Sequence, residues 1–118
     1  MSHTMNIKTE MRDKEALLAA CERLGTRMEE GTFSLYASRE KGLGVFLSDW
    51  SLPVVVKEDG TISYDNYDGE WGNITELDRL KDAYGLEKAA MEARKQGYSV
   101  FETTDEQGHL QLRIRVGE

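Results

Sequence analysis

The chain has 118 residues and a single cysteine, a length that fits one domain (1–118) able to bury its own core. Hydrophobic residues make up 39% and charged residues 31% of the sequence, a balance that excludes wholesale disorder, and the acidic net charge of −7 opposes binding to nucleic-acid phosphates and anionic lipid. Because a lone cysteine forms no internal disulfide and no apolar run approaches the roughly 20 residues of a membrane span, we expect a soluble cytoplasmic protein without membrane contact.

The N-terminal part predicts a strand followed by a helix. Apolar and charged residues alternate over 7–12, the period of a strand with one buried face. Asp13 can cap a helix whose apolar residues follow a helical spacing as far as Leu24, and Gly25 can end it. Cys21 lies on this apolar stripe, so we interpret it as a core residue.

The middle of the chain predicts short strands with turns between them. Residues 33–38 alternate as in a strand, and Arg39 to Gly44 has the glycine content of a flexible basic turn. A weaker strand pattern covers 45–49. The valines after Pro53 and the residues of 61–67 flank a Glu-Asp-Gly turn, which predicts a β-hairpin.

A long helix follows Trp71, with Asn73 or Thr75 as its cap and Gly97 as its terminator. Its apolar stripe changes sides near Gly85, so we expect either a kink there or burial on two sides. One side carries Leu77, Leu80, Tyr84 and Met91, and the other carries Ala83, Leu86, Ala90 and Ala93.

The C-terminal residues predict a second hairpin, with strands over 98–104 and 110–116. In the last strand Leu110, Leu112, Ile114 and Val116 share one face, and Gln111, Arg113 and Arg115 share the other. The whole pattern predicts an α+β fold: a two-layer sandwich of order β-α-β-β-β-β-α-β-β, with a mainly antiparallel sheet and two helices on one face. We expect the first and last strands at or near the centre of that sheet.

Two motifs suggest chemistry but fail in detail. The acidic run from Asp65 to Glu70 resembles a calcium loop, yet aligning Gly69 with the invariant glycine puts Tyr64 and Thr75 at positions that need carboxylates. The run from Lys41 to Gly44 lacks a third glycine, the Gly-Lys-Ser/Thr ending and the following helix pattern of a phosphate loop. Since His3 and His109 lie near opposite ends of the chain, we predict no metal, no cofactor and no catalytic residues.

Exposed rings and cations are the remaining candidates for a binding surface. Lys8, Arg113 and Arg115 would form a basic patch if the first and last strands were neighbours. The predicted binding surface consists of Trp71, Tyr84, Tyr67, Arg39, Lys41, Arg113 and Arg115.

Several segments resemble a known family. Met-Ser-His at 1–3, Ile7-Lys8-Thr9 and Arg12-Asp13 are similar to the opening of the family called hypothetical chloroplast reading frame thirty-five, or domain-of-unknown-function family 1257. The resemblance resumes at Trp71-Gly72 and continues through Leu77, Arg79-Leu80, Tyr84, Ala93, Gln96-Gly97 and the final strands, while 26–53 matches only in pattern. The chain departs from the family at Glu87, where many plastid members have histidine, and at Gly85, where alanine is expected. The family implies no established activity, cofactor or catalytic residue.

The function that these observations favour is a non-catalytic accessory module that binds another protein. The alternative is a small-ligand or nucleotide-binding protein that uses a cleft beside Trp71, Tyr84 and the predicted turn at 39–44. Nucleic acid is not an expected partner, because the net charge is negative.

Overall fold

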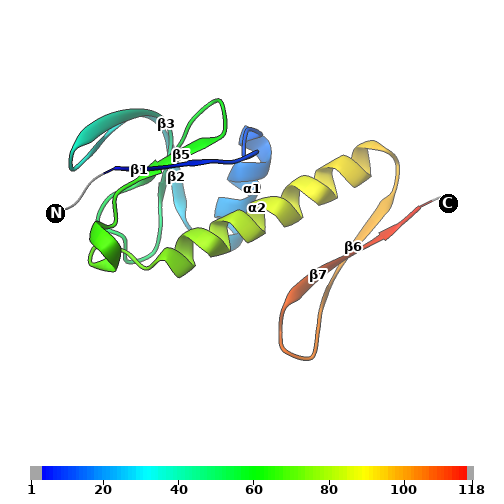
Figure 1. The fold of residues 1–118 in the computed structure, drawn as a ribbon. Coiled ribbons are helices and arrows are strands. Elements are labelled where there is room, and N and C mark those ends of the chain that lie inside the picture. The colour runs from blue at the N-terminus through cyan, green and yellow to red at the C-terminus, as the bar shows by residue number, and fades with distance from the viewer. Residues whose placement is uncertain (1–3, 117–118) are drawn as a thin grey trace.

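A computed structural model describes residues 4–116 (Figure 1). It has two α-helices, one short 3₁₀ turn and seven strands, in the predicted order. In chain order the elements are β1 (Met5–Lys8), α1 (Lys14–Leu24), β2 (Arg27–Leu35), β3 (Ser38–Phe46), β4 (Val54–Val56), β5 (Thr61–Tyr64), η1 (Tyr67–Gly69), α2 (Ile74–Lys95), β6 (Ser99–Thr104) and β7 (Leu110–Arg115). The α+β class predicted from the sequence is therefore confirmed.

The main sheet contains five strands in the order β1-β5-β4-β3-β2, and every neighbouring pair is antiparallel. The predicted hairpin is β4–β5, in which Val56 pairs with Ile62. The valines of β4 are buried because this strand lies at the centre of the sheet. An uninterrupted apolar run is typical of a strand covered on both faces.

The helices begin and end where the sequence predicts. Asp13 caps α1 by accepting from the backbone amides of Glu15 and Ala16, and Gly25 ends it in a left-handed conformation. Asn73 caps α2 by accepting from the Thr75 amide. Side chains of both helices share one core with the sheet, which includes Leu17, Cys21, Val45, Ile62, Leu77, Leu80 and Tyr84. Neither helix within the described range is long and apolar enough to cross a membrane.

The prediction of a turn at 39–44 is wrong. These residues lie inside β3, and the chain reverses earlier, at Tyr36 and Ala37 between paired Leu35 and Ser38. Gly42 and Gly44 suggested a turn, but both are required for close packing within the sheet. A Cβ at Gly44 would overlap the Phe33 ring, and a Cβ at Gly42 would meet the backbone of Val56. Of the strand predicted over 45–49, only Val45 and Phe46 lie in a strand, as the end of this longer β3. The turn at 36–37 interrupts the strand predicted over 33–38.

The placement of the first and last strands is also wrong. β1 lies at an edge of the main sheet, and β7 lies outside it, paired only with β6. Without a place in the sheet, β6 and β7 form a separate two-stranded element at the far end of α2 (Figure 1). We call β6 and β7 together the C-terminal hairpin.

α2 passes through Gly85 as one helix, with burial on two sides. Its first half contributes Leu77, Leu80 and Tyr84 to the core, and its second half buries Ala90 and Ala93. Of the two outcomes expected from the stripe, two-sided burial is the one observed. The second half extends beyond the sheet and carries the C-terminal hairpin (Figure 1).

Candidate functional site

The C-terminal hairpin is the first exposed surface. Directly paired residues of antiparallel strands share a face, so Val100, Ile114, Glu102 and Leu112 lie on one face and Phe101 and Arg113 on the other. Apolar side chains are exposed on both faces: Phe101 to 48% and Ile114 to 45%, with Val116 just beyond the strand at 69%. The apolar residues of β7 alternate as in a strand with one buried face, but no layer of the described structure covers Ile114 and Val116 at the end of that face.

One arginine joins the C-terminal hairpin to the helices. Arg23, in the last turn of α1, pairs with Glu87 of α2 at 2.7 Å and also with Glu102 of β6. The two carboxylates raise the pKa of Arg23, Glu102 contributing most. No sequence pattern indicates this bridge, because its three members are far apart in the chain and charged residues on helix surfaces are common. Glu87, the position at which the chain differs from the family pattern that it resembles, forms an ion pair with Arg23.

The second exposed surface is a row of three rings, Tyr36, Trp71 and Tyr67, which we call the aromatic row. The Trp71 ring lies in the middle, with centroids 5.7 Å from Tyr36 and 4.9 Å from Tyr67. Tyr36 is 72% exposed at the tip of the β2–β3 hairpin, and Tyr67 is 37% exposed in η1. Two segments far apart in the sequence therefore supply one surface.

Hydrogen bonds hold the loop of the aromatic row. The Trp71 amide donates to the Asn66 carbonyl at 2.9 Å, and the Ser51 amide donates to the Trp71 carbonyl at 2.8 Å. The Asn66 side-chain amide donates to the Gly72 carbonyl at 3.1 Å. These bonds fix a loop in which Tyr67 and Asp68 both have positive φ, at 47° and 52°. Such a conformation costs a non-glycine residue about 1–2 kcal/mol.

Asp65 immediately precedes this loop in the sequence. Its side chain is 1% exposed, and its Oδ1 accepts from the Tyr67 amide at 3.1 Å. Its Oδ2 has no hydrogen-bond partner among the described residues. The acidic run from Asp65 to Glu70, which does not match a calcium loop, thus forms the loop that carries Tyr67 of the aromatic row. Residues 4–116 contain no group of three or more His, Cys, Asp or Glu placed to hold a metal ion.

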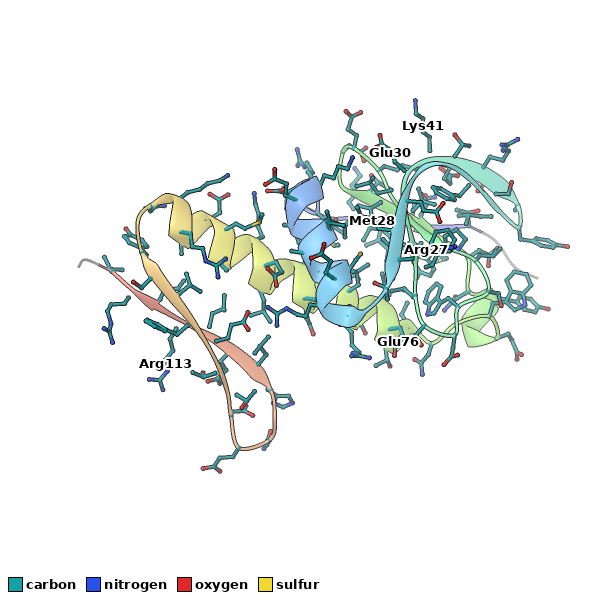
Figure 2. All side chains as sticks on the ribbon, turned by 180° about the vertical axis from the view of Figure 1, so that it is seen from behind. Arg27, Met28, Glu30, Lys41, Glu76 and Arg113 are labelled. Atoms are coloured by element: carbon teal, nitrogen blue, oxygen red, sulfur yellow. The ribbon has the colours of Figure 1, made fainter. Side chains whose placement is uncertain are left out.

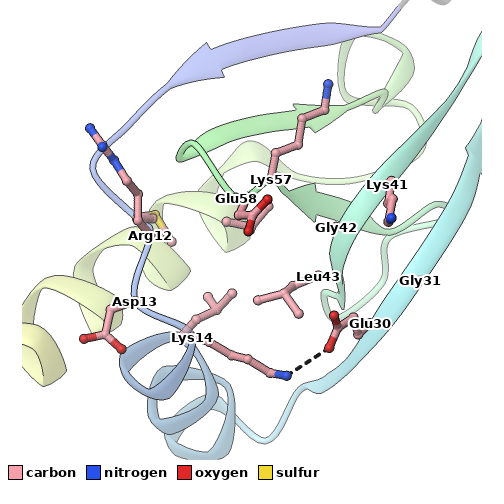
Figure 3. A pocket seen from close by; sticks show the side chains of 13 residues that line it. Arg12, Asp13, Lys14, Glu30, Gly31, Lys41, Gly42, Leu43, Lys57 and Glu58 are labelled. Carbon is pink, nitrogen blue, oxygen red and sulfur yellow. Dashed lines mark hydrogen bonds and ion pairs between the residues drawn. The ribbon is translucent and has the colours of Figure 1, made fainter.

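A pocket of about 540 Å³ lies between the start of α1 and strands β2 to β4 (Figure 3). Charged side chains surround it, but most are paired: Lys14 with Glu30 at 2.9 Å and Lys57 with Glu40 at 2.6 Å. The Lys14 ammonium lowers the pKa of Glu30. The lining has four cationic side chains, Arg12, Lys14, Lys41 and Lys57, and three carboxylates, Asp13, Glu30 and Glu58, so its charges nearly cancel and little net charge is left to select a ligand.

The structure distributes the predicted surface residues over several places. Trp71 and Tyr67 are together in the aromatic row, and Lys41 lines the pocket. Arg39 is exposed on β3. Tyr84 is buried in the core, where its hydroxyl accepts from the Asp13 amide at 3.0 Å, so it lines neither surface.

Arg113 and Arg115 lie on the C-terminal hairpin, where the Arg115 guanidinium is 5.5 Å from the centre of the Phe101 ring. Figure 2 shows Arg113 at the opposite end of the molecule from Lys41. The predicted patch with Lys8 is not formed, because β1 and β7 belong to different sheets. His3, one of the two histidines considered, lies outside the described residues.

Comparison with known proteins found no matching family model, no similar curated protein and no similar solved structure. The resemblance to domain-of-unknown-function family 1257 therefore stays a prediction.

Proposed function

We propose that the chain is a non-catalytic accessory module that binds another protein through its C-terminal hairpin, and that it acts in the cytoplasm. The supporting observation is the hairpin itself: no other strand of residues 4–116 pairs with either of its outer edges. An isolated two-stranded hairpin is marginally stable in water. Adding a strand from a partner would satisfy unpaired backbone groups and cover apolar side chains together.

Strand addition is the binding mode that this geometry favours. An unpaired strand edge presents a row of amide and carbonyl groups that can pair with an extended segment of another chain. Phe101 and Ile114 flank these edges on opposite faces, so an added strand would contact apolar side chains above and below. The main-chain pairing would supply affinity, and these side chains would supply specificity.

The experiment compares three immobilised proteins as baits in a native lysate: wild type, Ile114→Thr and Ile74→Thr. Threonine keeps the β-branched shape that suits a strand and lowers the apolar surface. Ile74 is the matched control, because it is 41% exposed on α2, against 45% for Ile114. We expect wild type and Ile74→Thr to retain the same partner in stoichiometric amount, and Ile114→Thr to retain about fivefold less.

Two results would contradict this function. One is the recovery of no stoichiometric partner by the wild-type protein. The other is equal recovery by Ile114→Thr, which would move the binding surface away from the C-terminal hairpin.

We also propose that the chain belongs to domain-of-unknown-function family 1257, on the residues given above.

The alternative function, small-ligand or nucleotide binding, has weaker support. Tyr84 is buried in the core, and the opposite charges that line the pocket beside Lys41 nearly cancel.

A further inference from the structure

We propose that the aromatic row is a second binding site, which takes an arginine- or lysine-bearing extended segment of a partner protein. This site is independent of the C-terminal hairpin. It uses the rings of Tyr36, Trp71 and Tyr67 and the carboxylates next to them in the sequence, Asp68 and Glu70.

The rings are suited to a cation. The face of a tryptophan or tyrosine ring carries negative charge density that attracts guanidinium and ammonium groups, and tryptophan binds them best. Trp71 is only half-buried, with a tyrosine on each side, and the neighbouring planes are tilted by 53° and 36° instead of stacked flat. A row of tilted, partly open rings fits the side chains of an extended peptide better than one enclosed small molecule.

The charges around the row favour the same ligand. Asp68 and Glu70, on either side of Gly69, are exposed, and neither forms an ion pair within the described part of the chain. Asp65 adds a buried carboxylate whose Oδ2 lacks a partner among the described residues. Unpaired carboxylates beside exposed rings select cations and repel anions, including nucleic acid.

The loop is built to present this surface. Tyr67 and Asp68 hold positive φ angles, and the hydrogen bonds from Trp71 and to Asp65 keep them there. Strained backbone that surrounding contacts maintain is concentrated at binding and active sites. A fixed loop also lowers the entropy lost on binding.

The probe is a fluorescent-labelled peptide with three arginines separated by glycines, and its counterpart with citrulline at the same positions. Citrulline has nearly the shape of arginine without its charge, so the pair isolates the cation. Binding to the full chain is followed by fluorescence anisotropy. We expect the arginine peptide to bind at least about tenfold more tightly than the citrulline peptide, with affinity that falls as salt is added.

Variants locate the binding. Tyr36→Ser removes a ring that is 72% exposed at a hairpin tip, so it leaves the core intact and should weaken the arginine peptide roughly fivefold. Glu70→Gln should weaken it by about the same factor. The controls are Leu18→Ser, an apolar side chain that is 44% exposed on α1, and Glu22→Gln, an exposed carboxylate on α1, and neither should change the affinity.

The proposal is overturned if the citrulline peptide binds as tightly as the arginine peptide. It is also overturned if Glu22→Gln weakens binding as much as Glu70→Gln, which would mean that the overall charge of −7 attracts the peptide without a site. Concentration-dependent self-association that Tyr36→Ser abolishes would assign the row to a second copy of the chain instead. Because these variants leave the C-terminal hairpin unchanged, each outcome is independent of the function proposed for that hairpin.

Discussion

A single residue at the N-terminus of α1, Asp13, connects the two helices. Asp13 caps α1 through Oδ1 and pairs through Oδ2 with the Lys88 ammonium of α2 at 2.9 Å. The bond from Lys88 and the amide of Ala16 lower the pKa of Asp13. A carboxyl group whose pKa is lower in the folded state stabilises the fold above its unfolded pKa, about 3.9, and loses that contribution as pH falls through the folded value.

Replacing Asp13 therefore has a pH-dependent effect. We expect Asp13→Ala to cost about 1 kcal/mol of unfolding free energy at pH 7, because the cap is lost. Asp13→Asn keeps a capping oxygen at every pH, so it should cost less at pH 7 and match the wild-type protein more closely below about pH 3. Urea unfolding between pH 2 and 7 measures this, and equal losses at all pH values would contradict it.

At the scale of elements, glycines decide how closely segments approach. A Cβ at Gly72 would overlap the ring of Trp50, whose Nε1 donates to the Asn73 carbonyl at 3.0 Å. A Cβ at Gly85, within α2, would meet nothing within 4 Å. Gly72 is therefore required by packing against Trp50, whereas Gly85 has no packing role and only weakens α2.

The two alanine variants should change stability in opposite directions. Gly72→Ala is expected to lower the free energy of unfolding by about 1–3 kcal/mol, because the Trp50 ring must move. Gly85→Ala is expected to raise it by about 0.5–1 kcal/mol, because alanine is the better helix former. Thermal unfolding of both variants tests the pair. A loss of stability in Gly85→Ala would show that the change of burial at this point depends on glycine.

Local signals predicted the elements better than their arrangement. The caps at Asp13 and Asn73 and the terminators at Gly25 and Gly97 act within a few residues, so the sequence carries them directly. The strand order depends on contacts between distant segments, which alternation does not encode. For the same reason the ring pair of Tyr36 and Trp71, supplied by two separate loops, could not be located from the sequence.

The whole molecule is elongated. Its radius of gyration is 15.6 Å, where a compact domain of this length would have about 13.5 Å. The described chain measures 54 × 31 × 21 Å, and the C-terminal hairpin extends from the distal end of α2 (Figure 1). Every buried residue of the described chain precedes Ser99, so the hairpin adds length without adding to the core. The two exposed surfaces belong to separate parts of the molecule.

The central claim is that the C-terminal hairpin is an element of low stability, joined to the body through Arg23 and available to a partner strand. Amide hydrogen exchange of the full chain at neutral pH tests it most directly. Amides of β6 and β7 should exchange about 100-fold faster than those of β3, β4 and β5, because few buried contacts oppose opening of the hairpin. Equal protection in the hairpin and in the central strands would contradict the claim, since it would show that the hairpin unfolds only with the whole domain.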